Sequence, residues 1–338
     1  MRILVTGATG FLAGHLIPAL QQRGHTVRAL VVPSADASGL EARGVSAFRG
    51  DVREPDSLTA AMRDADAVFH LAAAIGTWRP LEEYQAVNVT GTKNVCRAAL
   101  VAGVTRLVHV STTSVYEHGL REPVKEDSPL RPLPDPYALT KAAGDKLVQR
   151  MIAEQGLPAC IVRTSTIFGP GDRLNFGRIA DRLLAQKAIV IGSGRNTVPF
   201  VYVADVVQGL LLALERKQAV GQIYNIDDDN CPTQKELLKE IAEQVGARPP
   251  RIHVPRSLLY SAAYVAERVA ALTHSSQPLV TRHGVALYGT NNRYSIDKAR
   301  KELGYKPQVP LREGIRLTAA WYGENAAGPH RLSAVAAV

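Results

Sequence analysis

A glycine-rich turn near the start of the chain restricts the fold more than any other feature of the sequence. An apolar run at residues 3–5 leads into this turn, and a helical pattern of apolar side chains begins directly after it. Gly7 permits a tight turn, and Gly10 lets a ligand approach the backbone closely. The amides of Phe11 and Leu12 then open the helix, where negative charge is favoured. The turn therefore predicts a nucleotide site, with a tight turn that binds nothing as the alternative.

Strands and helices alternate through the first half of the chain. Because parallel strands need crossover helices between them, this alternation predicts an α/β fold with a doubly wound parallel sheet of the Rossmann type. We expect two later runs, at 200–203 and 222–225, to return to the same sheet. The predicted strands lie at 3–5, 27–32, 64–70, 106–111 and 159–163, and the predicted helices at 11–23, 88–102 and 137–155.

The regular alternation of strands and helices ends after Gly171, where loops lengthen and helices dominate. This change predicts a smaller, mostly helical C-terminal lobe that binds the substrate. We expect residues 1–172 and 197–229 to form the dinucleotide-binding domain, residues 173–196 and 230–322 to form the lobe, and residues 323–338 to be a flexible tail.

Composition excludes several other classes of protein. The 338 residues are 46% hydrophobic and 21% charged, as in globular domains, and the three cysteines are too widely spaced for a disulfide framework or a cysteine-rich zinc site. Lysine and arginine outnumber the acidic residues by 40 to 31 without a dense basic run, which favours anionic small molecules over nucleic acid.

Individual segments of the sequence also argue against a membrane span and against a metal site. The first residues lack a signal-peptide pattern, and the apolar segment 257–273 is too short and too charged to span a bilayer. His70 and His109 lie within apolar strands, so we expect them in the core rather than on a metal ion. We therefore expect a cytoplasmic protein with a small-molecule substrate, without a metal or a membrane span.

A tyrosine and a lysine one helical turn apart form the candidate chemical site. Tyr137 and Lys141 stand at i and i+4 on one predicted helix, and a nearby ammonium can lower the pKa of a phenol. Such a tyrosine can exchange a proton with a carbonyl or an alcohol. The hydroxyl-rich run from Ser111, which includes Thr112, ends the preceding strand, where sheets of this type place their ligands. The alternative is a surface pair that arose by chance.

A series of motifs then occurs in the order typical of one known family. They are TGATGFLA at 6–13, GDVR at 50–53, FHLAA at 69–73, NVTGT at 88–92, the hydroxyl run, the Tyr137–Lys141 pair and FGPG at 168–171. On these motifs the chain resembles the extended short-chain dehydrogenase/reductase family, also called the NAD-dependent epimerase/dehydratase family, from Met1 to about Tyr322. The end of the second predicted strand carries neither an acid nor an arginine that would select a cofactor, so NAD and NADP both remain open.

The resemblance implies roles for individual residues. Tyr137 would be the acid and base, Lys141 would hold the nicotinamide ribose and lower the pKa of Tyr137, and Thr112 would bind the substrate oxygen. Asp51 and Val52 would contact the adenine, although a helix cap is the alternative for Asp51. The cofactor-binding set implied in this way is Gly7, Gly10, Phe11, Leu12, Asp51, Val52, Leu71, Ala72, Ala73, Asn88, Tyr137, Lys141 and Ser165. Trp78 and Asn175 join Thr112 as candidate substrate contacts, with a lobe-interface plug and an exposed polar loop residue as their respective alternatives.

Some positions distinguish members of the family. Its dehydratases carry an Asp-Glu pair where this chain has Thr113 and Ser114, so dehydration is disfavoured. Its nucleotide-sugar epimerases usually carry a diphosphate-binding arginine at the position of Val198, which weakens an epimerase interpretation. The residues that could replace that arginine are Arg178, Arg195 and Arg293.

The second half is more similar to the 3β-hydroxysteroid dehydrogenase and sterol-carboxylate dehydrogenase branch. The expected function is an NAD(P)-dependent oxidoreductase that interconverts a secondary alcohol and a ketone on a bulky substrate, with a sterol-like one among the options. The alternatives are a nucleotide-sugar 4-epimerase that uses the same residues and a non-catalytic dinucleotide-binding regulatory protein. By resemblance, the helices at 88–102 and 137–155 would form the interface of a homodimer.

Overall fold

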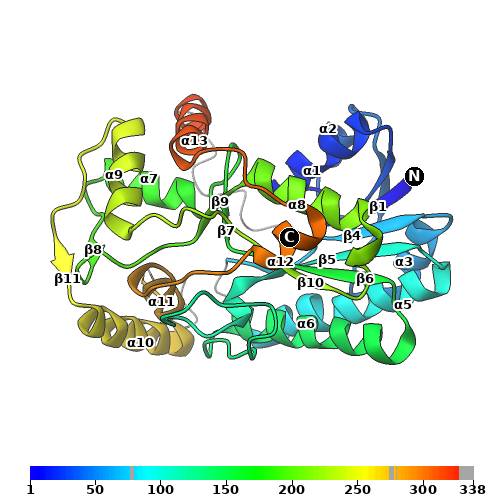
Figure 1. Ribbon diagram of the computed structural model, residues 1–338, viewed down its shortest axis with the longest axis horizontal. Helices are drawn as coiled ribbons and strands as arrows, with labels where there is room; N and C mark the ends of the chain where they lie inside the picture. The colour runs from blue at the N-terminus through cyan, green and yellow to red at the C-terminus, as the bar shows by residue number, and fades with distance from the viewer. Residues whose placement is uncertain (77–79, 274–277, 279, 327–338) are drawn as a thin grey trace.

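A seven-stranded parallel sheet forms the centre of the protein (Figure 1). The computed structural model describes residues 1–76, 80–273, 278 and 280–326. The strand order is β10-β6-β5-β4-β1-β2-β3, so the order reverses between β1 and β4 and opens a crevice at their carboxyl ends. The strands are β1 (Arg2–Thr6), β2 (Thr26–Val31), β3 (Ser46–Arg49), β4 (Ala67–His70), β5 (Arg106–Thr112), β6 (Ala159–Thr164) and β10 (Ile223–Ile226).

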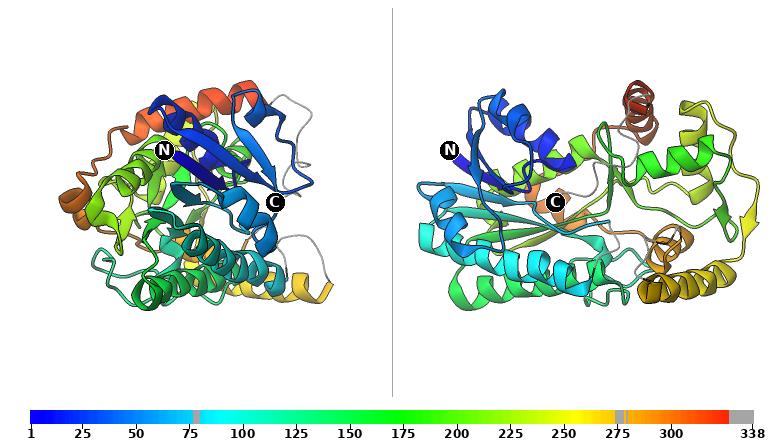
Figure 2. Two further views of the ribbon diagram at one scale, coloured as in Figure 1. Left: turned by 90° about the vertical axis from the view of Figure 1, so that its right-hand side faces the viewer. Right: turned by 180° about the vertical axis from the view of Figure 1, so that it is seen from behind.

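Helices cover both faces of this sheet, which confirms the doubly wound prediction (Figure 2). Successive side chains of a strand point to opposite faces, so Ile3 and Val5 pack in one core and Leu4 in the other. On the first face lie α1 (Phe11–Gln22), α8 (Val203–Glu215) and α12 (Asp297–Leu303), with the short elements α2 (Ser38–Glu41) and η3 (Lys217–Ala219) nearby. On the second face lie α3 (Pro55–Met62), α5 (Thr92–Ala102) and α6 (Pro136–Gln155).

A mostly helical lobe extends beyond the carboxyl ends of the strands (Figure 1). Its main core joins helices far apart in sequence, for example Phe176, Leu237 and Ile315. It contains α7 (Phe176–Leu184), β8 (Val190–Ile191), α9 (Gln234–Gln244), β11 (His253–Val254), α10 (Arg256–Thr273), α11 (Arg282–Gly289) and α13 (Leu311–Ala326), and β7 (Thr166–Phe168) and β9 (Phe200–Tyr202) border it.

The structure corrects parts of the predicted organisation. The run at 200–203 does not return to the central sheet, because β9 pairs with β7 after the chain leaves the sheet beyond Thr164. The predicted helix at 88–102 starts with a π-helical segment, η1 (Ala86–Gly91), which follows α4 (Leu81–Gln85). The predicted tail from residue 323 is also partly wrong, since α13 remains helical to Ala326.

The predicted division into a dinucleotide-binding domain and a substrate lobe remains a proposal, and we change the assignment of one segment. Ala299 and Leu303 of α12 pack into the core of the first sheet face, together with Ile296 and Tyr305. We therefore propose that this stretch of the 230–322 segment accompanies the dinucleotide-binding domain.

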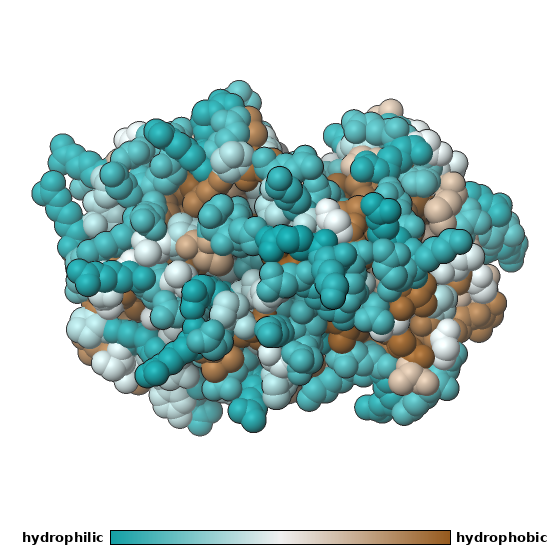
Figure 3. Space-filling view, viewed as in Figure 1, coloured by the Kyte–Doolittle hydropathy of each residue, from teal (hydrophilic) through white to brown (hydrophobic). Residues whose placement is uncertain are grey.

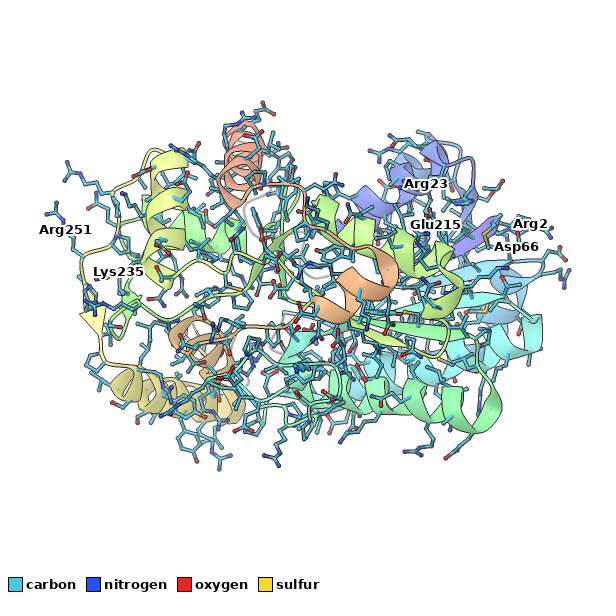
Figure 4. The ribbon with its side chains drawn as sticks, viewed as in Figure 1. Arg2, Arg23, Asp66, Glu215, Lys235 and Arg251 are labelled. Atoms are coloured by element: carbon cyan, nitrogen blue, oxygen red, sulfur yellow. The ribbon has the colours of Figure 1, made fainter. Side chains whose placement is uncertain are left out.

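Charged and apolar side chains share the surface. The face in Figure 3 is largely hydrophilic with scattered hydrophobic patches. Arg23 at the end of α1 pairs with Glu215 at the end of α8, with an N–O distance of 3.1 Å, and so links two helices at the rim opposite the carboxyl ends of the strands (Figure 4). An exposed pair of this kind contributes at most about 1 kcal/mol. None of the described helices has the length and apolar character needed to cross a membrane.

The apolar segment at 257–273 forms most of α10. Ala263 is buried against its neighbours in the lobe, as expected of a core segment. Several large side chains of the same helix are exposed instead, among them Leu258, Val265, Val269 and Leu272. The segment is therefore only partly a core element.

Candidate active site

The glycine turn lies in the crevice between β1 and β4. Gly7 has φ +66°, and a Cβ at this position would stand 2.7 Å from the backbone nitrogen of Ala72. Gly10 precedes α1 as its N-cap, and no side chain caps the first amides of that helix. Because four amides at a helix start lack intrahelical partners, this end of α1 suits a pyrophosphate. The cradle fits a dinucleotide, and it brings together the predicted residues Gly7, Gly10 and Ala72.

A buried chain of hydrogen bonds supports this crevice. The Thr6 hydroxyl lies 2.8 Å from Nδ1 of His70, and Nε2 of the same imidazole lies 3.0 Å from the Thr92 hydroxyl. The amide of Ala72 donates to the Thr6 oxygen at 3.2 Å. Burial lowers the pKa of His70 to about 3, with the Lys141 charge contributing, so the ring is neutral. His70 is therefore a core residue that fixes the turn after β4, as predicted.

Asp51 and Val52 follow β3. Burial alone would raise the pKa of Asp51, but hydrogen bonds from the side chain and amide of Arg53 outweigh it and lower that pKa. The carboxylate does not cap α3, whose N-cap is Glu54, so the alternative considered for Asp51 is wrong. Val52 is buried against Gly91, where a Cβ would stand 2.6 Å from a Val52 methyl group.

Asn88 joins the turn after β4 to α6. Its side chain accepts from the amide of Ala74 at 2.8 Å and donates to the Ala74 carbonyl at 3.1 Å and to the Thr140 hydroxyl at 3.0 Å. At Gly144, a Cβ would stand 2.4 Å from the Asn88 carbonyl oxygen, so α6 packs against the π-helical segment backbone to backbone. Asn88 thus positions the helix that carries Tyr137.

Tyr137 and Thr112 meet at the carboxyl end of β5. Asp135 caps α6 by accepting from the amide of Ala138 at 3.0 Å, which places Tyr137 in the first turn of the helix. Burial raises the pKa of Tyr137 to about 12, while hydrogen bonding with the Thr112 side chain opposes that rise. The phenol is therefore protonated at neutral pH. The direction is opposite to the sequence-based expectation of a lowered pKa.

Lys141 lies one turn further along α6. Its Nζ donates to the Val110 carbonyl of β5 at 2.8 Å, and the side chain is only 4% exposed. Burial lowers the pKa of Lys141 to about 8, although Asp145 favours the charged form. At neutral pH the ammonium is charged and desolvated, which costs stability.

We expect Lys141→Met to be more stable than the wild type at pH 7, by about 1–3 kcal/mol. Since the folded pKa lies below the model value of 10.5, the unfolded chain binds more protons between about pH 8 and 10.5. Wild-type stability should therefore rise with pH across that window relative to the variant. Urea unfolding of both proteins at pH 7 and pH 10 tests this. A variant less stable than the wild type at pH 7 would contradict the conclusion that the buried Lys141 ammonium destabilises the folded protein.

Ser165 lies in the break between β6 and β7. Its hydroxyl donates to Oδ1 of Asp227, at 2.5 Å, from the end of β10. Burial raises the pKa of Asp227 to about 7, and its other oxygen has no hydrogen-bond partner among the described residues. Sequence reasoning missed Asp227, although its place directly after a strand was a usable signal.

The two remaining substrate candidates differ in outcome. Asn175 donates from its side chain to the Ile167 carbonyl at 3.2 Å and is partly buried at the start of α7, so it is not simply an exposed loop residue. Trp78 lies outside the described residues. Among those residues, no group of three or more His, Cys, Asp or Glu side chains gathers in a way that would hold a metal ion.

The sequence analysis also did not predict a fully buried ion pair close to the site. Arg163 of β6 is 1% exposed and makes a bidentate contact with Asp145 of α6, at 2.8 and 2.9 Å. The same carboxylate accepts from Ser111 at 2.6 Å, and the guanidinium donates to the Tyr116 hydroxyl at 2.6 Å. The network thus ties α6 to the loop that follows Thr112.

Comparisons with known proteins show the family to which the chain belongs. Residues 3–227 match the model of the NAD dependent epimerase/dehydratase family. A 2-alkyl-3-oxoalkanoate reductase of Stenotrophomonas maltophilia is 33% identical, over 94% of this chain and 98% of that protein. A 3-beta-hydroxysteroid dehydrogenase of Mycolicibacterium neoaurum is 33% identical, over 95% of this chain and 91% of that protein. The crystal structure of gox2253 superposes with a TM-score of 0.81 at 33% identity, covering 96% of this chain and 98% of that one.

The parallel sheet, the crevice at its carboxyl end and the family match together define an enzyme with a Rossmann-type sheet and a dinucleotide cofactor, NAD or NADP. The chain belongs to the NAD-dependent epimerase/dehydratase family, and its similarity to a hydroxysteroid dehydrogenase places it in the sterol dehydrogenase-like branch of the extended short-chain dehydrogenases/reductases.

Proposed function

We propose that this protein is an NAD(P)-dependent oxidoreductase that interconverts a secondary alcohol and a ketone on a bulky substrate. One observation carries the proposal: the hydroxyls of Tyr137 and Thr112 interact at the carboxyl end of β5, with Lys141 one turn further along α6. Two relatives, the oxoalkanoate reductase and the hydroxysteroid dehydrogenase, support a substrate whose reacting oxygen stands on a large apolar body, with a sterol-like one among the options.

The proposed chemistry follows from the state of each side chain. In the reducing direction, the phenol of Tyr137 donates its proton to the carbonyl oxygen, and its raised pKa keeps that proton in place beforehand. The Thr112 hydroxyl donates a hydrogen bond to the same oxygen. The Lys141 ammonium, which donates to the Val110 carbonyl, would hold the nicotinamide ribose beside this phenol. NAD or NADP, held by the cradle at Gly7, supplies or accepts the hydride.

An absorbance assay tests this function and separates it from its rivals. The purified protein is mixed with added NADH or NADPH and a panel of bulky ketones, and nicotinamide absorbance is compared with product formed. An oxidoreductase consumes one reduced cofactor for each ketone. A 4-epimerase turns over a nucleotide sugar with no added cofactor, and a regulatory protein binds the dinucleotide without turnover. Either of these results would overturn the proposal.

The structure supplies one observation against the epimerase. Val198, at the position of the diphosphate-binding arginine, is fully buried in the core of the lobe beside Phe176 and Phe200. Of the three possible substitutes, Arg195 is exposed, Arg293 donates to the Arg121 carbonyl at 2.7 Å, and Arg178 donates to the Gly76 carbonyl at 3.4 Å. Dehydration remains disfavoured, because Thr113 and Ser114 replace the two acids.

We also propose a cytoplasmic homodimer that pairs through α5 and α6. The outer side of these helices exposes Val101 at 85% and Leu139 at 43%. Leu139→Arg is expected to halve the mass measured by light scattering at micromolar concentration, because each protomer would bury a guanidinium group in the interface without a counter-ion. Leu258→Arg on α10 serves as the control. A wild-type protein that is monomeric in the same measurement contradicts the dimer.

A further inference from the structure

Two histidines from separate parts of the chain lie near Tyr137, one in contact with its ring and the other in contact with the first histidine. His283 of α11 makes an edge-on contact with that ring, at a centroid distance of 6.4 Å and an angle of 81°. His118, in the loop after η2 (Thr113–Val115), contacts His283 in the same way at 6.0 Å and 88°. An imidazole pair therefore stands beside the residue that we propose as the acid, with one ring from the lobe and one from the loop after η2.

Asn292 determines which nitrogen of His118 carries the proton. Nδ1 of His118 lies 3.0 Å from Oδ1 of Asn292, whose amide nitrogen donates to the carbonyls of Leu287 at 2.9 Å and Ala286 at 3.1 Å. Those contacts fix Oδ1 as an acceptor, and it also accepts from the amide of Gly119 at 3.2 Å. Nδ1 of His118 must therefore be the donor.

The other nitrogen of His118 is then an acceptor. Burial lowers the pKa of His118 to about 4, with the neighbouring His283 contributing, so the ring is neutral at pH 7. Nε2 of His118 and Nδ1 of His283 are both buried, and neither has a hydrogen-bond partner among the described residues. Leaving such atoms unsatisfied costs about 1–3 kcal/mol each, so a polar group that bonds to both would bind favourably.

We propose that His118 and His283 recognise a hydroxyl group next to the reacting carbonyl of the substrate. The inference rests on the proposed function, which places the carbonyl oxygen at Tyr137 and Thr112. A hydroxyl would donate to Nε2 of His118 and accept from Nδ1 of His283 in the tautomer that carries its proton there, and it would then satisfy both atoms. A carboxylate has no proton to donate, and its charge would face the lone pair of Nε2. The pair thus favours a hydroxyketone over the parent ketone and over an oxo acid.

Matched ketones test this selectivity. Benzoin carries a hydroxyl beside its carbonyl, and deoxybenzoin lacks it. Benzoylacetate carries a carboxylate in place of the second phenyl ring of deoxybenzoin. We expect the wild type to reduce benzoin with kcat/KM ~10- to 100-fold above deoxybenzoin, since one satisfied buried acceptor accounts for a factor of that size. Benzoylacetate should be no better than deoxybenzoin.

Two variants assign the selectivity to the pair. His118→Asn keeps a donor near the Nδ1 position for Asn292 but removes Nε2, and His283→Phe keeps an aromatic edge on Tyr137 but removes Nδ1. We expect either change to bring benzoin to within about threefold of deoxybenzoin, because the bond to the hydroxyl is lost. Deoxybenzoin has no hydroxyl for the pair to bind, so its kcat/KM should fall by a much smaller factor than that of benzoin. A role limited to positioning Tyr137 would instead lower kcat for both ketones equally.

Calorimetry separates this inference from the proposed function. Tighter binding of benzoin than of deoxybenzoin, abolished by His118→Asn, supports the hydroxyl site even if neither ketone is reduced, and that result would refute only the oxidoreductase. Equal behaviour of the two ketones with the wild type, in both binding and turnover, overturns the hydroxyl site. Equal losses for both ketones in the variants overturn it as well.

Discussion

Tyr137→Phe is expected to lower kcat/KM for ketone reduction by about 10²- to 10⁴-fold, the range that general acid–base catalysis supplies. The substitution removes one hydroxyl and leaves the ring, so its contact with His283 and the fold of α6 should persist. The dinucleotide cradle at Gly7 does not depend on that hydroxyl, so cofactor affinity should change by only a few fold. Steady-state kinetics and a cofactor titration by fluorescence measure the two quantities.

A matched tyrosine provides the control for this variant. Tyr264 is 46% exposed on α10, away from β5, and Tyr264→Phe should keep full activity. If Tyr137→Phe also keeps near-full activity, the proton donor is another residue. If it loses activity and cofactor affinity together, the hydroxyl supports the cofactor rather than the proton transfer.

Arg163→Met is expected to lower the free energy of unfolding by about 3–5 kcal/mol. The change leaves the Asp145 carboxylate buried at 0% exposure without its counter-ion, while Ser111 and Gln149 still donate to it. Because Arg163 also holds the Tyr116 hydroxyl and the Glu126 carbonyl, the loop after Thr112 should loosen and activity should fall as well. Chemical denaturation with intrinsic fluorescence measures the loss.

A double variant shows whether the uncompensated charge is the cause. Asp145→Leu combined with Arg163→Met removes both charges, and such replacements can be neutral or stabilising. We expect the double variant to recover most of the lost stability. A double variant that is less stable than Arg163→Met would mean that hydrogen bonds and packing around the pair, rather than its charges, determine the cost.

The parts of the fold that the sequence predicts correctly depend on local patterns. Alternating apolar runs and glycine-terminated helices identified six of the seven central strands and the helices around them. The glycine turn was predictable because a positive φ at Gly7 and the close approach of Ala72 admit almost no other residue. Helix spacing and the end of a strand likewise predicted Tyr137 and the hydroxyl run from Ser111, and the family resemblance selected Thr112 within that run.

The rest depends on contacts between distant segments. Nothing local shows that β9 pairs with β7, that Asn88 lies in a π-helical segment packed against Gly144, or that Lys141 turns its ammonium to Val110. His283 reaches Tyr137 only because α11 folds over the ends of the strands. Burial also raises the pKa of the Tyr137 phenol, whereas the sequence led us to expect a lowered pKa. The desolvation that causes this rise exists only in the folded protein.

The most direct test is a crystal structure of the protein with NADH or NADPH and a ketone. The account predicts the pyrophosphate against Gly7 and Gly10, and the ketone oxygen within hydrogen-bond distance of both Tyr137 Oη and Thr112 Oγ1. A dinucleotide bound elsewhere, or a ketone oxygen held away from Tyr137, would contradict it.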